Sequence, residues 1–293
     1  MIQKDRYYEC IYSLTVCPYG QSDRILYRED EMTVLDFSKR KQNNQKISMV
    51  TCYDATFAHL IGKTAIDCIL IGDSCAMIVY GEKTTIPMKT PALARHTAAV
   101  RNGAPEKFIV ADMPFLSFRE GKKHAVQAAG ILIRAGADAV KLEGCDGNEK
   151  IITHLVESGI PVMGHLGLTP QFYHSLGGYK IQGRNAAAAE KIKSQAARLQ
   201  EAGCFSLVLE CVPEQLAAEI AQALSIPVIG IGAGRHVDGQ VLVLHDLLGL
   251  TEFKPTFVHH YLDGAALVTD ALNQYTQDVS AGVFPHETEV FSS

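Results

Sequence analysis

The sequence lacks the features that would place it in a membrane or on a nucleic acid. No apolar run approaches the roughly 20 residues that a membrane-spanning helix needs. The formal net charge is −5 over 293 residues, so no excess of positive charge is present to attract a polyanion. We therefore expect a cytoplasmic protein whose partners are small molecules, with no nucleic acid and no membrane among them.

Paired cysteine motifs are missing too. The eight cysteines form no C-x-x-C pair, and several lie inside apolar runs. We expect buried, reduced thiols and no structural zinc site. Residues 1–31 show no sustained period, and their six acidic residues argue against a transit peptide. We expect this segment to be a poorly ordered extension and residues 32–293 to form a single domain.

From Met32 onward, short β-branched runs alternate with alanine-rich helical stretches such as those at 122–137, 185–204 and 212–224. Such alternation predicts a parallel sheet, and eight repeats in about 250 residues are enough to close it into a (β/α)8 TIM barrel. A doubly wound open sheet is the alternative, but the glycine fingerprint that often follows its first strand is absent. The strand candidates are residues 47–54, 68–73, 107–112, 138–144, 160–167, 205–211, 226–234 and 241–246.

Acidic residues recur where these strands end, which is the face that carries the active site in a closed barrel. One acid after a strand is more often a turn or N-cap residue. Together they favour a carboxylate cluster of the kind that Mg²⁺ uses. The positions at or after the strand ends are Asp54, Asp73, Asp112, Glu143, His165, Glu210, the glycine-rich residues 230–234, and His245 with Asp246.

Two of these strands carry further information. Lys141 and Glu143 are two residues apart, so both side chains face the lumen, where charges are costly to bury without partners. Glu210 follows three branched residues and has no basic residue beside it in the sequence, so desolvation is expected to raise its pKa toward the range of a general base.

Two features remain open. The glycine-rich residues 230–234 fit a phosphate cradle and a plain tight turn equally well. His165 could orient a substrate or carry a proton, and it could equally be a core histidine bonded to a carbonyl group.

Several motifs, taken in order, closely resemble the ketopantoate hydroxymethyltransferase family from about residue 33 to about residue 285. The first 31 residues lie outside the family pattern, and residues 75–76 and 84–90 are small departures from it that touch no proposed ligand. The matching motifs are GDS (72–74), DMPF (112–115), VKLEG (140–144), GHLGLTPQ (164–171), GGYKIQGR (177–184), LVLECVP (207–213), IPVIGIGAG (226–234) and DGQVLVLHD (238–246).

The resemblance implies a barrel of the phosphoenolpyruvate/pyruvate type that depends on Mg²⁺. It further implies transfer of a hydroxymethyl group from 5,10-methylenetetrahydrofolate to 3-methyl-2-oxobutanoate, which gives 2-dehydropantoate and tetrahydrofolate in the first step of pantothenate synthesis. A homo-oligomer, in this family a decamer, is implied as well. By this resemblance Asp73, Asp112 and Glu143 hold the metal, Asp73, Ser74, Asp112 and Lys141 contact the 2-oxo acid, and Glu210 is the catalytic base.

Two other interpretations compete with this one. The first is another Mg²⁺-dependent 2-oxo acid lyase or phosphonomutase of the same superfamily, although the KKCGH-type loop typical of those enzymes is absent. The second is a non-catalytic barrel that senses a metabolite, which would have no need for a base such as Glu210 beside a metal.

Overall fold

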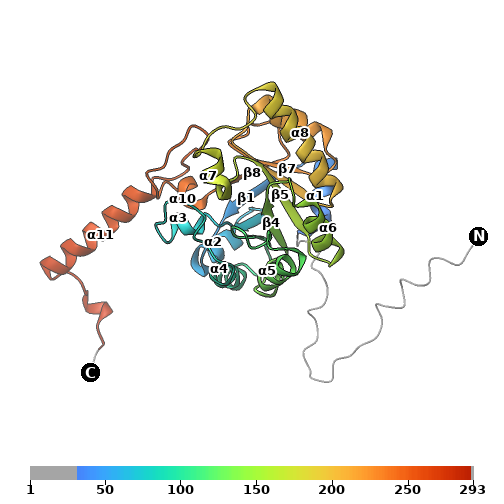
Figure 1. The fold of residues 1–293 in the computed structure, drawn as a ribbon. Coiled ribbons are helices and arrows are strands. Elements are labelled where there is room, and N and C mark those ends of the chain that lie inside the picture. Colours follow the sequence, from blue (N-terminus) through green and yellow to red (C-terminus); the bar gives the residue numbers. More distant parts are fainter. Residues whose placement is uncertain (1–31, 292–293) are drawn as a thin grey trace, which may run out of the picture. The chain divides into compact units, whose positions relative to one another are not determined.

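Eight parallel strands close into a barrel in the computed structural model, which describes residues 32–291 (Figure 1). Each strand pairs with the next along the chain, and β8 closes the ring by pairing with β1. This confirms the predicted barrel. The expectation for residues 1–31 falls outside the described range. The strands are β1 (Ile47–Thr51), β2 (Cys68–Ile71), β3 (Phe108–Asp112), β4 (Ala139–Glu143), β5 (Val162–Gly167), β6 (Ser206–Glu210), β7 (Val228–Ile231) and β8 (Gly239–Leu242).

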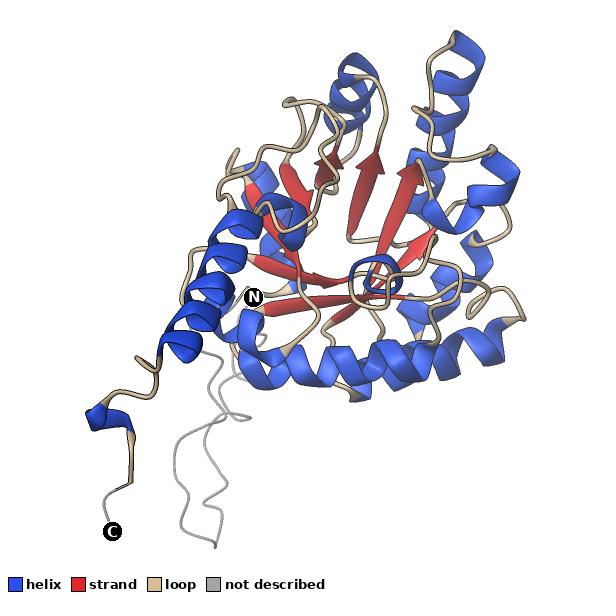
Figure 2. Ribbon diagram, turned by 90° about the vertical axis from the view of Figure 1, so that its left-hand side faces the viewer, coloured by secondary structure: helices blue, strands red, loops and turns tan. Residues whose placement is uncertain are grey.

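Helices surround the strands (Figure 2). The three alanine-rich stretches form α5, α8 and α9, as their composition predicts. Among residues 32–291, no helix is long and apolar enough to cross a membrane. The helices are α1 (Val34–Gln42), α2 (Ala55–Gly62), α3 (Cys75–Ile78), α4 (Thr90–Gly103), α5 (Lys122–Arg134), α6 (Glu149–Glu157), α7 (Tyr173–Leu176), α8 (Ala186–Glu201), α9 (Glu214–Ala223), α10 (Leu244–Leu247) and α11 (Gly264–Ala281), with short 3-10 turns η1 (Pro170–Phe172) and η2 (Glu287–Glu289).

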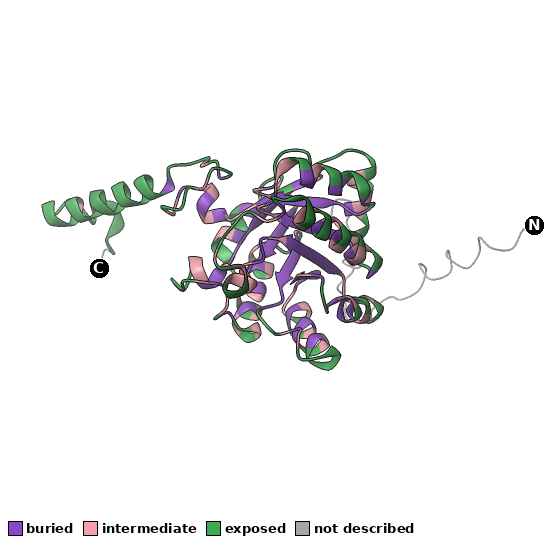
Figure 3. Ribbon diagram, turned by 45° about the horizontal axis from the view of Figure 1, so that its top comes forward, coloured by how far each residue is buried: buried purple, intermediate pink, exposed green. Residues whose placement is uncertain are grey.

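Apolar side chains form two layers, one between the strands and the helices and one inside the barrel. Burial follows this arrangement, because the strands are buried and the outer faces of the helices are exposed (Figure 3). Phe37 of α1 belongs to the inner layer, where its ring packs edge-on against Phe108 and Phe205 at centroid distances of 5.1 and 5.0 Å. The other inner residues are Ile47, Met49, Cys68, Leu70, Val110, Ala139, Met163, Val208, Ile229 and Val241.

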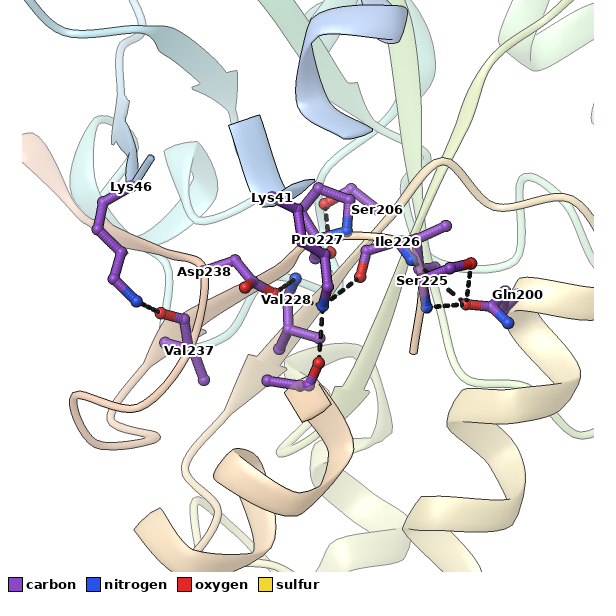
Figure 4. Close-up of polar contacts among 11 residues, drawn as sticks. Lys41, Lys46, Gln200, Ser206, Ser225, Ile226, Pro227, Val228, Val237 and Asp238 are labelled. Atoms are coloured by element: carbon purple, nitrogen blue, oxygen red, sulfur yellow. Dashed lines mark hydrogen bonds and ion pairs between the residues drawn. The ribbon is translucent and has the colours of Figure 1, made fainter. Parts of the chain in front are cut away.

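Lys41 anchors α1 beside the amino ends of β7 and β8 (Figure 4). Its ammonium group donates to the carbonyl oxygens of Ala221 at 2.7 Å and Ile226 at 3.0 Å, and it pairs with Asp238 at 2.8 Å. The same Asp238 oxygen accepts the main-chain N–H of Val228 at 2.8 Å. These bonds satisfy main-chain groups that the strands leave unpaired, so this end of the barrel is structural.

Several predicted strands are shorter than the sequence suggested, and for β1 and β8 this corrects the strand-end positions. β1 ends at Thr51, and Asp54 caps α2 by accepting the main-chain N–H of Phe57 at 2.9 Å. Asp54 is therefore an N-cap residue. β8 ends at Leu242, so His245 and Asp246 lie on α10. The chain turns there because the N–H of Leu244 bonds the hydroxyl of Thr51.

Candidate functional site

Three carboxylates and a lysine meet at the carboxyl ends of β2, β3 and β4. Asp73 follows β2, Asp112 ends β3, and Lys141 and Glu143 lie on β4; all four side chains are buried and line one pocket. The main-chain N–H of Asp73 donates to Asp112 Oδ2 at 2.9 Å, and Lys141 Nζ lies 2.9 Å from Asp112 Oδ1. The structure thus brings the predicted residues together.

The alternation predicted for β4 is present. Val140 and Leu142 belong to the layer under the helices, whereas Lys141 and Glu143 point into the pocket. Burial alone would lower the pKa of Lys141, but the neighbouring carboxylates, chiefly Asp112 and Glu143, raise it. The ammonium group is therefore held in its charged form.

His165 connects Glu143 to Glu210. Its Nδ1 lies 3.3 Å from Glu143 Oε1, and its Nε2 lies 3.3 Å from Glu210 Oε2. Burial and the charge of Lys141 would lower the pKa of His165, but the two glutamates outweigh them and raise it to about 9. His165 thus lies between the two glutamates, with Lys141 Nζ also 3.3 Å from its Nδ1, which favours the functional interpretation over that of a core histidine bonded to a carbonyl group.

Glu210 is less isolated than its sequence neighbours suggest. It ends β6, lines the pocket, and keeps 19% of its side chain exposed while facing His165. The expectation of a desolvated carboxyl without a basic neighbour is therefore wrong, since strand pairing places His165 opposite Val208, two residues before Glu210 on the same face. A partly exposed carboxylate at a pocket wall can still accept a proton from a bound substrate.

Ser74 is the N-cap residue of the short helix α3 and lines the pocket beside Asp73. Its hydroxyl lies 2.9 Å from the hydroxyl of Tyr53, which is buried. The two hydroxyl groups form a small polar patch next to the carboxylates, in keeping with the predicted substrate contact at Ser74.

The glycine-rich residues 230–234 behave as a tight turn. Gly232 and Gly234 have left-handed φ angles of 61° and 78°, and a side chain at Gly234 would collide with Glu214. The main-chain N–H of Arg235, which follows them, already donates to Glu214 Oε1 at 3.0 Å. A carboxylate in that place disfavours a bound phosphate.

The pocket has a volume of about 570 Å³, within the range of sites for drug-sized ligands. Beyond the carboxylates its wall is mostly apolar and comes from three regions, which contribute Met77 and Ile78, Tyr179 and Ile181, and Phe253, Pro255, Phe257 and Val258. Asp246 of α10 also lies in this wall, and burial raises its pKa. The sequence placed Asp246 on a strand, and it gave no chemical reason to single out Tyr179 or the residues from 253 onward.

The donor set suits a hard divalent cation. Across the described part of the chain, no three His, Cys, Asp or Glu side chains are arranged to hold a metal ion by themselves. Mg²⁺, however, commonly takes one or two carboxylates and completes its shell with water and substrate oxygens. Burial and the charges of Asp112 and Glu143 raise the pKa of Asp73 well above its usual range. This repulsion is what a bound cation would relieve, so Asp73 and Asp112 fit a magnesium site.

The fold is similar to that of solved (β/α)8 barrels. A 2,3-dimethylmalate lyase described as a member of that superfamily matches with a TM-score of 0.59 and 15% identity over 84% of this chain and 89% of the other. A phosphoenolpyruvate phosphomutase from Streptomyces platensis matches with a TM-score of 0.58 and 11% identity over 86% and 88%. At these identities the likeness concerns the fold alone.

Sequence relatives identify the family. The profile of the ketopantoate hydroxymethyltransferase family matches residues 31–287. A 3-methyl-2-oxobutanoate hydroxymethyltransferase from Bdellovibrio bacteriovorus is 55% identical over 89% of this chain and 99% of its own length, and one from Francisella tularensis subsp. novicida is 52% identical over 86% and 96%. The chain belongs to the ketopantoate hydroxymethyltransferase family, as its motifs predict.

Proposed function

We propose that this protein is a 3-methyl-2-oxobutanoate hydroxymethyltransferase that uses Mg²⁺ and 5,10-methylenetetrahydrofolate to make 2-dehydropantoate for pantothenate synthesis. The observation that carries the proposal is the meeting of Asp73, Asp112, Glu143 and Lys141 with Glu210 in one pocket, in a chain of this family. The rival lyases and mutases share the fold at 15% identity or less. A sensor would not need the paired Glu210 and His165.

The chemistry follows from the arrangement of charges. Glu210 takes the proton from carbon 3 of the 2-oxo acid, and the resulting enolate carbon forms a bond to the methylene carbon of the folate. Both bonds from that carbon to the folate nitrogens break, and water supplies its hydroxyl group. Tetrahydrofolate leaves with the proton taken by Glu210 and the second proton of the water. Lys141 stabilises the negative charge that develops on the keto oxygen. Asp73 and Asp112, with Glu143 beside them, would hold the Mg²⁺, which supplies Lewis-acid stabilisation of the same charge. Ser74 would bind the substrate carboxylate.

The size of the pocket supports two substrates. A five-carbon acid fills only part of about 570 Å³, and the apolar wall from Tyr179 to Phe257 leaves space for the larger co-substrate. We also propose that the protein works in the cytoplasm, where its substrates would be found.

We further propose a homo-oligomer, for which the family suggests a decamer. Helix α11 supports this, because only Gly264 of its 18 residues is buried. Val268, Leu272, Tyr275 and Val279 are spaced by four, three and four residues, so they form one apolar stripe that lies 47% to 62% exposed.

Proton exchange at carbon 3 tests the proposed chemistry without the folate. In D₂O with Mg²⁺ the protein should exchange that proton of 3-methyl-2-oxobutanoate, and a metal chelator should stop the exchange. Glu210→Gln should slow exchange by about 100-fold or more, since a general base contributes that much. It should change substrate affinity far less. Absence of exchange in the wild-type protein would refute the proposed function, and exchange that survives Glu210→Gln would refute the role of Glu210.

A further inference from the structure

Gln171 is a neutral, buried side chain in the middle of the charged cluster, and it has no role in the chemistry above. It lies on η1, which follows β5, and only 3% of it is exposed. Its side-chain amide donates one hydrogen bond to Asp73 Oδ2 at 2.8 Å and a second to the carbonyl oxygen of Met113 at 2.9 Å. Its main-chain N–H donates to Glu143 Oε2 at 3.0 Å.

These bonds connect four strand ends through one residue. Asp73 follows β2, Met113 follows β3, Glu143 ends β4, and Gln171 comes from the segment after β5. Both hydrogens of the amide group are used, so its orientation is fixed. Gln171 therefore sets the positions of two of the three carboxylates relative to each other and to the end of β3.

The bonds also divide the oxygens of the carboxylates into two kinds. Gln171 takes Oε2 of Glu143, and the N–H of Asp73 takes Oδ2 of Asp112. The other oxygens, Glu143 Oε1 and Asp112 Oδ1, are buried and accept no hydrogen bond from the described residues, although they lie 3.3 Å from His165 and 2.9 Å from Lys141. In Asp112 and Glu143, one oxygen thus accepts a main-chain N–H, and the other oxygen faces Lys141 or His165.

An amide is suited to this task because it donates hydrogen bonds without adding charge. A lysine or arginine in its place would compete with a divalent cation for the carboxylates, and an apolar residue would leave Asp73 Oδ2 without its donor. We propose that Gln171 is a positioning residue that holds Asp73 and Glu143 in the orientation that binds the divalent cation. This inference rests on the proposed function, since it takes Asp73 as a metal ligand.

The test is the affinity of the folded protein for Mg²⁺, measured by titration calorimetry. Gln171→Met keeps the length of the side chain and the main-chain bond to Glu143, but it removes both amide donors. The dissociation constant for Mg²⁺ should rise by about 10-fold to 100-fold, the usual cost of losing a group that orients a metal ligand. The matched control is Gln195→Met, because Gln195 makes a similar amide bond to Asp146 at 2.9 Å on the outside of the barrel. The Mg²⁺ dissociation constant of Gln195→Met should stay within about twofold of the wild-type value, which is a negligible change in binding free energy.

Measurements of proton exchange distinguish a role of Gln171 in orienting the metal ligands from a general disruption of the site. In Gln171→Met the Mg²⁺ concentration for half-maximal exchange should rise with the dissociation constant, while the rate at saturating Mg²⁺ stays within about threefold, well under the loss expected when a base is removed. A fall in the saturated rate with unchanged Mg²⁺ affinity would overturn the proposal. So would unchanged affinity in a variant whose thermal unfolding is normal.

Two further outcomes keep the test decisive. If Gln171→Met does not fold, Gln171→Asn carries the same test, because its amide is one methylene too short to reach both acceptors, and the same two results would overturn the proposal. If the wild-type protein neither binds Mg²⁺ nor exchanges the proton, the proposed function fails, and the inference fails with it. A wild-type protein that does both, beside an unaffected Gln171 variant, refutes the inference alone.

Discussion

Gly167 lies where β5 passes closest to Glu210. Its φ is 91°, and a β-carbon there would collide with the carbonyl oxygen of Glu210 and lie 2.8 Å from Val212. The neighbouring N–H of Leu168 donates to that same carbonyl oxygen at 2.8 Å. The position of the proposed base therefore depends on the absence of a side chain at residue 167.

Gly167→Ala should displace the end of β6 and slow proton exchange on the order of 100-fold, the cost of about 1 Å of misplacement at a reacting group. Mg²⁺ affinity should change less than the exchange rate, because the proposed ligands lie on other strands and, among the described residues, only Gln171 hydrogen-bonds them to the segment after β5. Gly159→Ala is the control: Gly159 also has a left-handed φ, 82°, but nothing lies within 4 Å of its added β-carbon. Gly159→Ala should lose about 1 to 2 kcal/mol of stability from its left-handed φ alone, as measured by urea unfolding, and Gly167→Ala should lose more because its β-carbon also collides with a main-chain oxygen. Normal exchange in a folded Gly167→Ala would contradict this account.

At the level of residues, the sequence predicted what depends on periodicity and missed what depends on register. Lys141 and Glu143 could be assigned to the lumen because strand side chains alternate. The pairing of Glu210 with His165 could not be foreseen, because it requires the alignment of β5 with β6. Gln171 was also missed, since a neutral side chain in a loop has no distinctive sequence signal.

Helix α1 supports the barrel from the end opposite the site, and Asp36 stabilises its first turn. The Asp36 carboxylate accepts hydrogen bonds from the N–H and the hydroxyl of Thr33 at 2.8 and 2.6 Å, and it pairs with Lys39 at 2.8 Å. The hydrogen bonds from Lys39 and Thr33 lower the pKa of Asp36 from 3.8 to about 2. Phe37, which packs inside the barrel, is the next residue.

Asp36→Asn should lower the free energy of unfolding by about 1 kcal/mol near neutral pH. Because the folded-state pKa lies below that of the unfolded chain, the stabilisation is complete above the unfolded value of 3.8 and is lost as the pH falls through about 2. Urea unfolding of both proteins from about pH 7 to about pH 3 should therefore show that the difference between their free energies of unfolding begins to decrease at the acidic end. A free-energy difference that stays constant, or increases as the pH falls, would contradict the stabilising role of the Asp36 carboxylate.

At the level of elements, the sequence predicted all eight strands but not where several of them end, and the differences at β1 and β8 move proposed site positions. Apart from His245, residues 52–54 and 243–246 are apolar or acidic and continue the strand pattern, yet the chain leaves the sheet there to begin α2 and α10. The hydrogen bonds that decide this, from Phe57 to Asp54 and from Leu244 to Thr51, include one to a residue 193 positions away. Composition alone cannot report such a contact.

Across the whole molecule, the two ends of the barrel have opposite chemistry. Three phenylalanine rings pack together inside it beside α1, whereas the carboxyl ends of the strands hold buried charges. Buried, repelling carboxylates cost stability. The apolar inner layer supplies the rigid support that such a site needs, because well-packed side chains hold the strand ends in place.

Helix α11 is the surface through which the proposed homo-oligomer would assemble. Its apolar stripe, Val268, Leu272, Tyr275 and Val279, would cost free energy if it stayed in water, so a second copy of the chain is expected to cover it. Leu272→Glu places a charge in the centre of the stripe. It should shift the protein to smaller species in light scattering coupled to size exclusion, because an unpaired charge is strongly disfavoured in an apolar contact.

Gln277→Glu is the matched control for that change, since it adds the same charge to an exposed polar position on the same helix. It should leave the molar mass unchanged. Proton exchange by the Leu272→Glu protein then shows whether each barrel works alone: the residues of the proposed site all come from one chain, so exchange per chain should persist after dissociation. A wild-type protein that is already monomeric, or a Leu272→Glu protein of unchanged mass, would show that α11 does not mediate assembly.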